Sequence, residues 1–349
     1  MYRRRFKRQV EVFPQTLEEF GYMLNEAGEI RDLQSNEPYQ FEVKPKDHDY
    51  NKKRYDAFIS IVGDKVEEKL QRDPYNFVKQ TVPVNANPEN GDIHSYFYMT
   101  PNALTTPDRL LILIPGNDTR IGQWSKRVMC DENINMGSMI HTTALAKERG
   151  YEVIILNPSA NVWYDGKPSE MPPPNNEKCE DIPENENPEA HTLYVFRHFI
   201  RHAKAKDVSV IAMGWGGYSF TLVINEHFDF IKSRVRGVAL SNSAHTRDLI
   251  DGDDKRVWIR SHMVNLDASN QPKGEVLADT RFGCECLSSA QEISDFIITS
   301  CEKEIWRFID LKMGDIEEIT VDTEIDADAP LDEAEEAELA EHLNVVSVG

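Results

Sequence analysis

Hydrophobic residues along this chain follow two patterns. Apolar positions alternate at residues 77–84 and 94–100 and form short continuous runs at 110–115, 151–157, 208–212, 235–241 and 282–287. Both patterns are typical of strands, and the continuous runs predict buried parallel strands. Apolar residues at three- and four-residue steps predict helices at 52–70, 139–150, 188–205, 218–226 and 293–311. The chain is therefore predicted to have an α/β fold, with a mainly parallel central sheet and helices on both faces.

Residues 208–224, VSVIAMGWGGYSFTLVI, read as a strand, a sharp turn and a helix. In α/β-hydrolases this arrangement is the nucleophile elbow, G-x-S-x-G, whose central serine is the nucleophile. Here Ala212 and Gly216 stand at the outer positions and Gly214 at the centre. Glycine has no side chain, so the sequence predicts an elbow without its nucleophile.

The other positions of a hydrolase site are also altered. The loop after the strand at 110–115 usually donates an oxyanion-hole N–H, but it begins with Pro115, which has none. Asn242 follows the strand at 235–241, where a triad acid is expected, and an amide cannot stabilise an imidazolium as a carboxylate does. The loop at 288–292, where a catalytic histidine would arrive, contains none. We therefore expect no catalytic residue. A vestigial pocket or binding site is expected at Pro115, Gly116, Asn117, Trp215, Gly216 and Gly217.

Trp215 stands where a hydrolase contributes the second oxyanion-hole N–H. We expect its ring to fill the vacated pocket, because a buried aromatic is common in a strand–turn–helix corner. The alternative is an exposed ring that anchors a partner.

Three other functions remain open. A hydrolase with a displaced nucleophile would use Ser219, Ser241 or Ser243, with His245 as base. A sensor of small ligands or anions would use the backbone N–H groups of the turn at 214–217. Direct RNA binding would rest on the basic N-terminus and the pair Lys126 and Arg127. His198 and His202 are spaced for a metal but lack a third ligand, so we expect neither a metal nor a cofactor.

Charge and composition narrow the classes of partner. The chain of 349 residues has a net charge of −21, which argues against a duplex-DNA surface. No Lys or Arg follows Lys312, so residues 313–349 are expected to be an acidic disordered tail. Residues 1–12 form a basic segment, either a nuclear-localisation signal or a solvated end, and residues 158–187 an acidic, proline-rich surface loop. The five scattered cysteines suit a reducing compartment, and no apolar run reaches transmembrane length.

Several short segments, taken together and in order, resemble the Argonaute-binding-protein-two (Arb-two) domain, in particular its animal branch of co-transcriptional regulators. They are Phe13-Pro14-Gln15-Thr16-Leu17-Glu18, Asn51-Lys52-Lys53-Arg54-Tyr55, Gly122-Gln123-Trp124, Gly150-Tyr151 with Val153–Pro158, Pro188-Glu189-Ala190-His191 with Tyr194-Val195, and Gly216-Gly217. The resemblance implies one α/β-hydrolase-like domain at residues 13–312. It also implies a place in the nucleus, alone or together with the cytoplasm, with Argonaute-type proteins and chromatin or splicing factors as partners. Small RNA would be met only indirectly, in silencing, heterochromatin or alternative splicing.

This chain departs from the family at the site. Many members resemble hydrolases there, with His-Ser-Tyr-Gly-Gly at the elbow, Asp after the next strand and a histidine in the last loop. The matching positions here are Gly214, Asn242 and, in the last loop, Gln291. Loss of one triad member already reduces the rate by orders of magnitude. We therefore predict a non-catalytic, hydrolase-like interaction domain.

Overall fold

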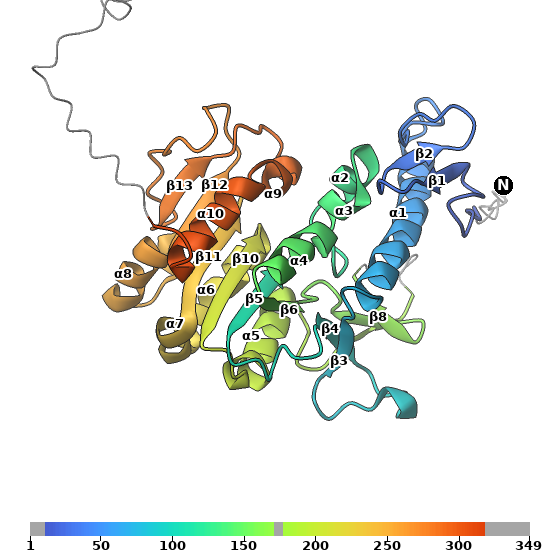
Figure 1. The fold of residues 1–349 in the computed structure, drawn as a ribbon. Coiled ribbons are helices and arrows are strands. Elements are labelled where there is room, and N and C mark those ends of the chain that lie inside the picture. The colour runs from blue at the N-terminus through green and yellow to red at the C-terminus, as the bar shows by residue number, and fades with distance from the viewer. Residues whose placement is uncertain (1–10, 171–176, 318–349) are drawn as a thin grey trace, which may run out of the picture. The chain divides into compact units, whose positions relative to one another are not determined.

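The computed structural model describes residues 11–170 and 177–317 (Figure 1). Nearly all of the basic segment and of the predicted tail lies outside these ranges. Asp315 is described, and its carboxylate pairs with Arg109 at 2.5 Å. The folded domain therefore extends beyond the predicted boundary at residue 312.

An eight-stranded sheet holds the domain together, in the order β13-β12-β11-β10-β5-β6-β4-β3. Its strands are β3 (Val78–Val82), β4 (Ser95–Met99), β5 (Arg109–Ile114), β6 (Tyr151–Ile155), β10 (Asp207–Met213), β11 (Val235–Ser241), β12 (Met263–Asp267) and β13 (Glu285–Ser288). Numbered along the chain, the spatial order is 1-2-4-3-5-6-7-8. The second strand, β4, is antiparallel to both neighbours, and all the other pairs are parallel. This is the arrangement of α/β-hydrolases, so the predicted fold class is confirmed.

Helices cover both faces of this sheet. They are α1 (His48–Gln71), α2 (Lys126–Asp131), α3 (Ile134–Gly137), α4 (Met139–Glu148), α5 (Pro188–His198), α6 (Trp215–Glu226), α7 (Phe228–Arg234), α8 (Asp253–His262), α9 (Ile297–Ser300) and α10 (Glu302–Met313). Side chains of α1, α4, α9 and α10 share one buried cluster, and those of α5 to α8 share the other. Figure 1 shows α4 and α10 on the nearer face.

β5 explains why the central strands are continuously apolar. Leu111 and Leu113 belong to the first cluster, whereas Leu110, Ile112 and Ile114 belong to the second. Successive side chains of a strand point to opposite faces, so a strand covered on both sides needs apolar residues throughout. None of the helices in the described ranges combines the length and the apolar character needed to cross a bilayer.

The segment at 158–187 differs from the predicted surface loop. It contains β7 (Val162–Tyr164), β8 (Lys167–Ser169) and β9 (Glu180–Asp181), which form a small antiparallel sheet. Its hairpin turn at Asp165 and Gly166 has positive φ at both residues, as a two-residue hairpin loop requires. A second small sheet pairs β1 (Tyr22–Leu24) with β2 (Ile30–Asp32).

Two further elements differ from the predictions. β12 was missed, because MVNLD is short and carries a central asparagine in place of a long apolar run. The helix predicted at 293–311 is divided at Cys301 into α9 and α10. The other predicted strands and helices are confirmed, with ends that shift by a few residues, except that the helix predicted at 188–205 already ends at His198.

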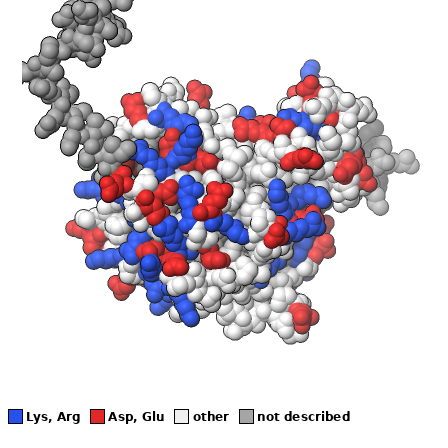
Figure 2. Space-filling view, in the orientation of Figure 1, with Lys and Arg blue, Asp and Glu red and all other residues white. Residues whose placement is uncertain are grey.

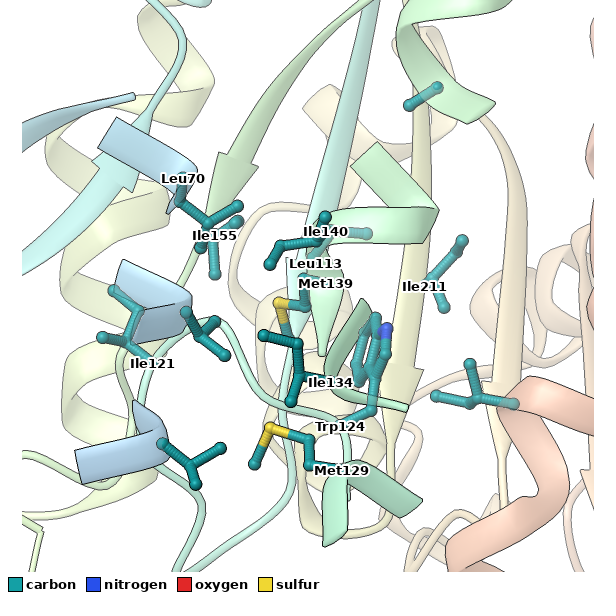
Figure 3. Packing of buried hydrophobic residues seen from close by; sticks show 14 of the residues in the cluster. Leu70, Leu113, Ile121, Trp124, Met129, Ile134, Met139, Ile140, Ile155 and Ile211 are labelled. Atoms are coloured by element: carbon teal, nitrogen blue, oxygen red, sulfur yellow. The ribbon is translucent and has the colours of Figure 1, made fainter. Parts of the chain in front are cut away.

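Trp124 belongs to the first cluster and lies near Met129, Ile134 and Met139 (Figure 3). Its indole N–H donates to Thr142 Oγ1 at 3.0 Å. Gly122, two residues earlier, has φ +80°, and a Cβ there would lie 2.7 Å from Leu70 Cδ1. Gly122 therefore serves close packing against α1, and Trp124 joins this segment to α4.

A buried charge joins α1 to the sheet. Glu67 is 5% exposed and accepts hydrogen bonds from Tyr98 at 2.6 Å, Tyr96 at 2.9 Å and Arg120 Nε at 2.6 Å. Arg120 also donates to the carbonyl of Ser60, so it ties the loop after β5 to α1. Arg120 also pairs with Asp64 at 2.6 Å, so loss of Glu67 would leave the buried Tyr98 hydroxyl without an acceptor but would not leave the arginine unpaired.

We predict that Glu67→Ala lowers the free energy of unfolding by about 1–3 kcal/mol, because the buried Tyr98 hydroxyl loses its acceptor while Arg120 keeps Asp64. Glu68→Ala is the matched control: that neighbour is 39% exposed and pairs with Lys65 on the surface. Its loss should cost less than about 1 kcal/mol. Urea denaturation of both variants measures the difference, and equal effects would contradict the structural role assigned to Glu67.

Candidate functional site

The turn between β10 and α6 has the conformation of a strained elbow. Gly214 has φ 52° and ψ −117°, a backbone state that L-residues rarely adopt. Its N–H donates to Ser241 O at 2.9 Å, and its carbonyl accepts from Ala244 N–H at 3.0 Å. The turn is thus fixed against the loop after β11. A Cβ built on Gly214 meets no atom within 4 Å, so the position opens into free space.

The next two glycines allow three segments to meet closely. A Cβ on Gly216 would lie 2.7 Å from the carbonyl oxygen of Ile114 and 2.8 Å from that of Pro115. A Cβ on Gly217 would lie 2.1 Å from Ser243 Oγ. Real Cβ atoms do not approach so closely, so glycine is required where α6 passes the ends of β5 and β11. The structure therefore brings the predicted positions Pro115, Gly216 and Gly217 together at this edge of the sheet.

Trp215 does not fill a vacated pocket, and the expectation that it would is wrong. The side chain opens α6 and is 40% exposed. Its indole N–H donates to a carboxylate oxygen of Glu189, and its ring lies 4.7 Å from that of Tyr218. The first residue of this helix points away from the core, because the neighbouring glycines occupy the face that packs on β5 and β11. Trp215 is thus an exposed aromatic ring held in one place.

The loop after β5 lies beside the turn. A Cβ on Gly116 would lie 3.6 Å from Met213 O, so the loop and the end of β10 are in contact distance. Pro115 has no N–H to offer, as the sequence indicates, and Asn117 is exposed. Ser159, after β6, donates to Gly116 O at 3.5 Å and joins the loop after β6 to the loop after β5.

An acid that the sequence analysis missed lies at the end of β12. Asp267 is the last residue of that strand, and burial raises the pKa of its carboxyl group. Its backbone carbonyl accepts a hydrogen bond from Ser289 Oγ at 2.7 Å, in the loop after β13. In the sequence, only the short segment MVNLD indicates the strand that ends at this acid. Gln291 lies in the same loop, and its carbonyl accepts from Ser269 N–H at 2.9 Å.

Asn242 begins the loop after β11 with φ 45°, a left-handed state that asparagine tolerates better than most residues. Its N–H donates to Leu266 O at 2.8 Å, so it spans to β12. Asn242 therefore has a structural role, because its backbone turns the chain and bonds to β12.

Ser243 and His245 form a hydrogen-bonded pair in the same loop. Ser243 Oγ lies 2.7 Å from His245 Nδ1, and His245 Nε2 lies 3.1 Å from the carbonyl of Phe282. A carbonyl only accepts, so Nε2 carries the proton and Nδ1 accepts from the serine. Both residues are buried, and burial lowers the pKa of His245 to about 4. Ser219 and Ser241, the other proposed nucleophiles, are buried in α6 and β11.

His191, in the segment Pro188–His191, has a structural role. It is fully buried, its Nε2 accepts from Asn157 N–H at 3.0 Å, and its Nδ1 lies 2.6 Å from Asn185 Oδ1. The imidazole therefore joins the end of β6 to α5. Burial lowers its pKa to about 3, so the ring is neutral at pH 7.

A cavity of about 700 Å³ lies away from the turn, between α1, β3 and β4, and the β7–β8 hairpin. Glu67, Arg120, Tyr96 and Trp163 are among its lining residues. No residue of the loops at 115–117 or 214–217 lines this cavity. Within the described ranges, no group of three or more His, Cys, Asp or Glu side chains is placed to hold a metal ion. On the face shown in Figure 2, basic and acidic side chains are interspersed.

Comparison with known families gives one clear match. The model of the Arb2 domain matches residues 13–273. The Cotranscriptional regulator ARB2A homolog of Xenopus tropicalis is 30% identical over 339 residues, which cover 85% of this chain and 80% of that protein. The human Cotranscriptional regulator ARB2A is 31% identical over 300 residues, covering 74% of this chain and 71% of that protein.

Solved structures are more distant. A histone deacetylase from Saccharomyces cerevisiae has a TM-score of 0.46 and 14% identity, over 73% of this chain and 97% of its own. A predicted CIB-like hydrolase from Thermoplasma acidophilum has a TM-score of 0.38 and 10% identity, over 68% of this chain and 98% of its own.

The two buried histidines generate a pH prediction. Their folded pKa values, about 3 for His191 and about 4 for His245, lie below the unfolded value near 6.5. Below pH 6.5 the unfolded chain therefore binds more protons, and stability falls as the pH falls. We expect each histidine to contribute about 1 kcal/mol to the loss of unfolding free energy between pH 7 and pH 5.5.

Urea denaturation at the two pH values measures that loss, in the wild type and in His191→Gln. The variant should lose about 1 kcal/mol less than the wild type over this interval, whatever its stability at pH 7. An unchanged pH dependence in His191→Gln would contradict the neutral, buried state assigned to His191.

Proposed function

This chain belongs to the Arb2 domain family, and on that premise we propose that it is a non-catalytic, hydrolase-like domain that binds partner proteins in nuclear co-transcriptional regulation. Its relatives in vertebrates carry the name cotranscriptional regulator. The family resemblance suggests Argonaute-type proteins and chromatin or splicing factors as the partners, with small RNA reached only through them.

One observation carries the non-catalytic part of the proposal. The turn at Gly214 keeps the backbone of an elbow and opens into free space, yet the residue offers no nucleophilic atom. The loop after β13 supplies Ser289, Ala290 and Gln291 in place of a base. Asp267 stands at the end of β12, but the loop after β13 contains no histidine for its carboxylate to orient.

A second candidate function rests on the pair Ser243 and His245. Their hydrogen bond of 2.7 Å is the arrangement that activates a serine nucleophile. Two features oppose it. His245 Nε2 faces the neutral carbonyl of Phe282 in place of a carboxylate, and Ser243 is 7% exposed where it packs on Gly217. A buried hydroxyl has no access to an ester or amide.

We predict that the purified protein takes up no fluorophosphonate label and does not hydrolyse short acyl esters. Intact-mass spectrometry after incubation with the probe measures labelling directly. Ser243→Ala is the diagnostic variant. Stoichiometric labelling of the wild type that disappears in Ser243→Ala would establish the serine hydrolase in place of the non-catalytic domain.

Trp215 is the proposed anchor of the partner surface. Tryptophan is enriched at binding hot spots, and a ring already held by Glu189 and Tyr218 loses little conformational freedom on binding. An exposed ring of this kind at the open edge of the sheet is better placed to bind a partner protein than to stabilise the core.

We predict that Trp215→Ala lowers the free energy of unfolding by about 1 kcal/mol or less, because it removes one surface hydrogen bond and one ring contact. Partner capture should be lost. Affinity purification with mass spectrometry compares the wild type with Trp215→Ala and with Phe41→Ala, an aromatic control that is 44% exposed. A capture profile unchanged by Trp215→Ala would contradict this surface, and capture of no nuclear protein by the wild type would contradict the proposed function.

A further inference from the structure

Two adjoining cavities lie on the side of the domain formed by α8 and the segment that leads into β13. Their volumes are about 250 Å³ and 540 Å³. Both are lined by Arg247, Arg260 and Gly283, so they share a wall. The larger one lies within the size range of ligand pockets. Neither includes a residue of the turn at Gly214, and this site is independent of the question of catalysis.

The two shared arginines have unused hydrogen-bonding capacity. Among the residues that the structure describes, the side chain of Arg260 has no hydrogen-bond or ion-pair partner. The guanidinium of Arg247 meets only Asp248, at 3.8 Å, which is longer than a hydrogen bond. Arg281 nearby differs, because Asp279 binds it through several bonds of 2.5–3.0 Å. Each guanidinium has five N–H donors, so nearly all the donors of these two arginines are available to a ligand in the cavities.

Gly283 fixes the positions from which these side chains extend. It has φ +71°, and a Cβ there would lie 2.8 Å from Arg247 Cβ and 3.0 Å from Ile259 Cδ1. Arg247 is further held by its own N–H, which donates to Arg281 O at 2.7 Å. Arg260 follows the buried Ile259 in the last turn of α8. The stem of Arg247 therefore packs directly against Gly283, and Arg260 extends from the residue next to Ile259, which packs against the same glycine.

The chemistry of the pair favours a phosphate group. A guanidinium binds carboxylate or phosphate through two parallel N–H···O bonds. Two guanidinium groups without strong anionic partners match a dianion better than a single carboxylate. Of the acids that line the two cavities, Asp279 is bound to Arg281, Asp248 is 88% exposed to water, and Glu285 is exposed.

The surroundings favour a peptide over a nucleic acid as the carrier of that phosphate. Val276 is 62% exposed and lines the larger cavity together with Leu277, which offers apolar contact to a neighbouring side chain. Asp248, Asp279 and Glu285 interrupt the basic surface, and the chain carries a net charge of −21. A polyanionic strand needs a continuous basic track, whereas one phosphorylated residue does not.

We propose that Arg247 and Arg260 bind the phosphate of a phosphorylated serine, threonine or tyrosine in a partner protein, with Val276 and Leu277 contacting the residues beside it. This adds a phosphate-dependent surface to the domain, separate from the one centred on Trp215.

The test uses the purified full chain and a fluorescein-labelled random dodecapeptide library with a fixed central phosphoserine. The unphosphorylated library and a random single-stranded RNA of similar length are the comparison probes. Fluorescence anisotropy measures binding to the wild type, to Arg247→Gln/Arg260→Gln and to the charge-matched control Lys303→Gln/Arg307→Gln. The control residues lie exposed on α10. Thermal melts verify that all three proteins are folded.

We expect the wild type and the control to bind the phosphorylated library roughly tenfold or more tightly than the unphosphorylated one. The Arg247→Gln/Arg260→Gln variant should lose that preference. Arg260→Lys, which keeps the charge but not the two-pronged geometry, should recover only part of it. Equal binding of the two libraries, or an equal loss in the control, would overturn the proposal. Tighter binding of RNA than of the phosphorylated library, lost in the arginine variant, would overturn it in favour of a nucleic-acid site.

Discussion

The left-handed backbone at Gly214 is the constraint on which this end of the sheet depends. It allows β10 to stop and α6 to start within one residue, its N–H donates to Ser241 at the end of β11, and its carbonyl accepts from Ala244 in the loop that follows. Gly216 and Gly217 then let the helix pass within contact of β5 and of Ser243. As a result, Trp215 has no room on the inner face and points outward. The exposed ring follows from the same geometry that, in an α/β-hydrolase, would present a nucleophile.

Much of this architecture could be predicted from the sequence, because the central strands are buried on both faces. LLILI and VSVIAM are apolar at nearly every position, and the glycine-rich turn between strand and helix is a local signal. The elements that were missed lack such signals. β12 is five residues long with Asn265 at its centre. Because this strand was not predicted, Asp267 was not recognised as an acid at the end of a strand. The β7–β8 hairpin has two three-residue strands in a segment dominated by proline and acids.

The site was less predictable than the fold, because side-chain direction depends on packing between distant segments. Trp215 was expected to be buried, since nothing local distinguishes a large apolar residue that points inward from one excluded by glycines on the inner face. The pair of Ser243 and His245 was named only as an alternative, and its hydrogen bond depends on the position of Phe282, far along the chain. The motifs shared with the family mostly hold the fold. Gly122 packs against α1, Trp124 donates to Thr142 of α4, and His191 joins the end of β6 to α5.

The unfolding free energy of Gly214→Ala tests the elbow most directly. A Cβ at this position meets no atom within 4 Å, so no clash complicates the result. If the turn has φ 52°, alanine there should cost roughly 1–3 kcal/mol of backbone strain. Where glycine occupies an ordinary conformation, the same substitution stabilises a protein by about 0.4–1 kcal/mol. An unchanged or increased stability would therefore show that the turn is not an elbow. It would also contradict the account in which the backbone conformation at Gly214 produces the open site and the exposed tryptophan.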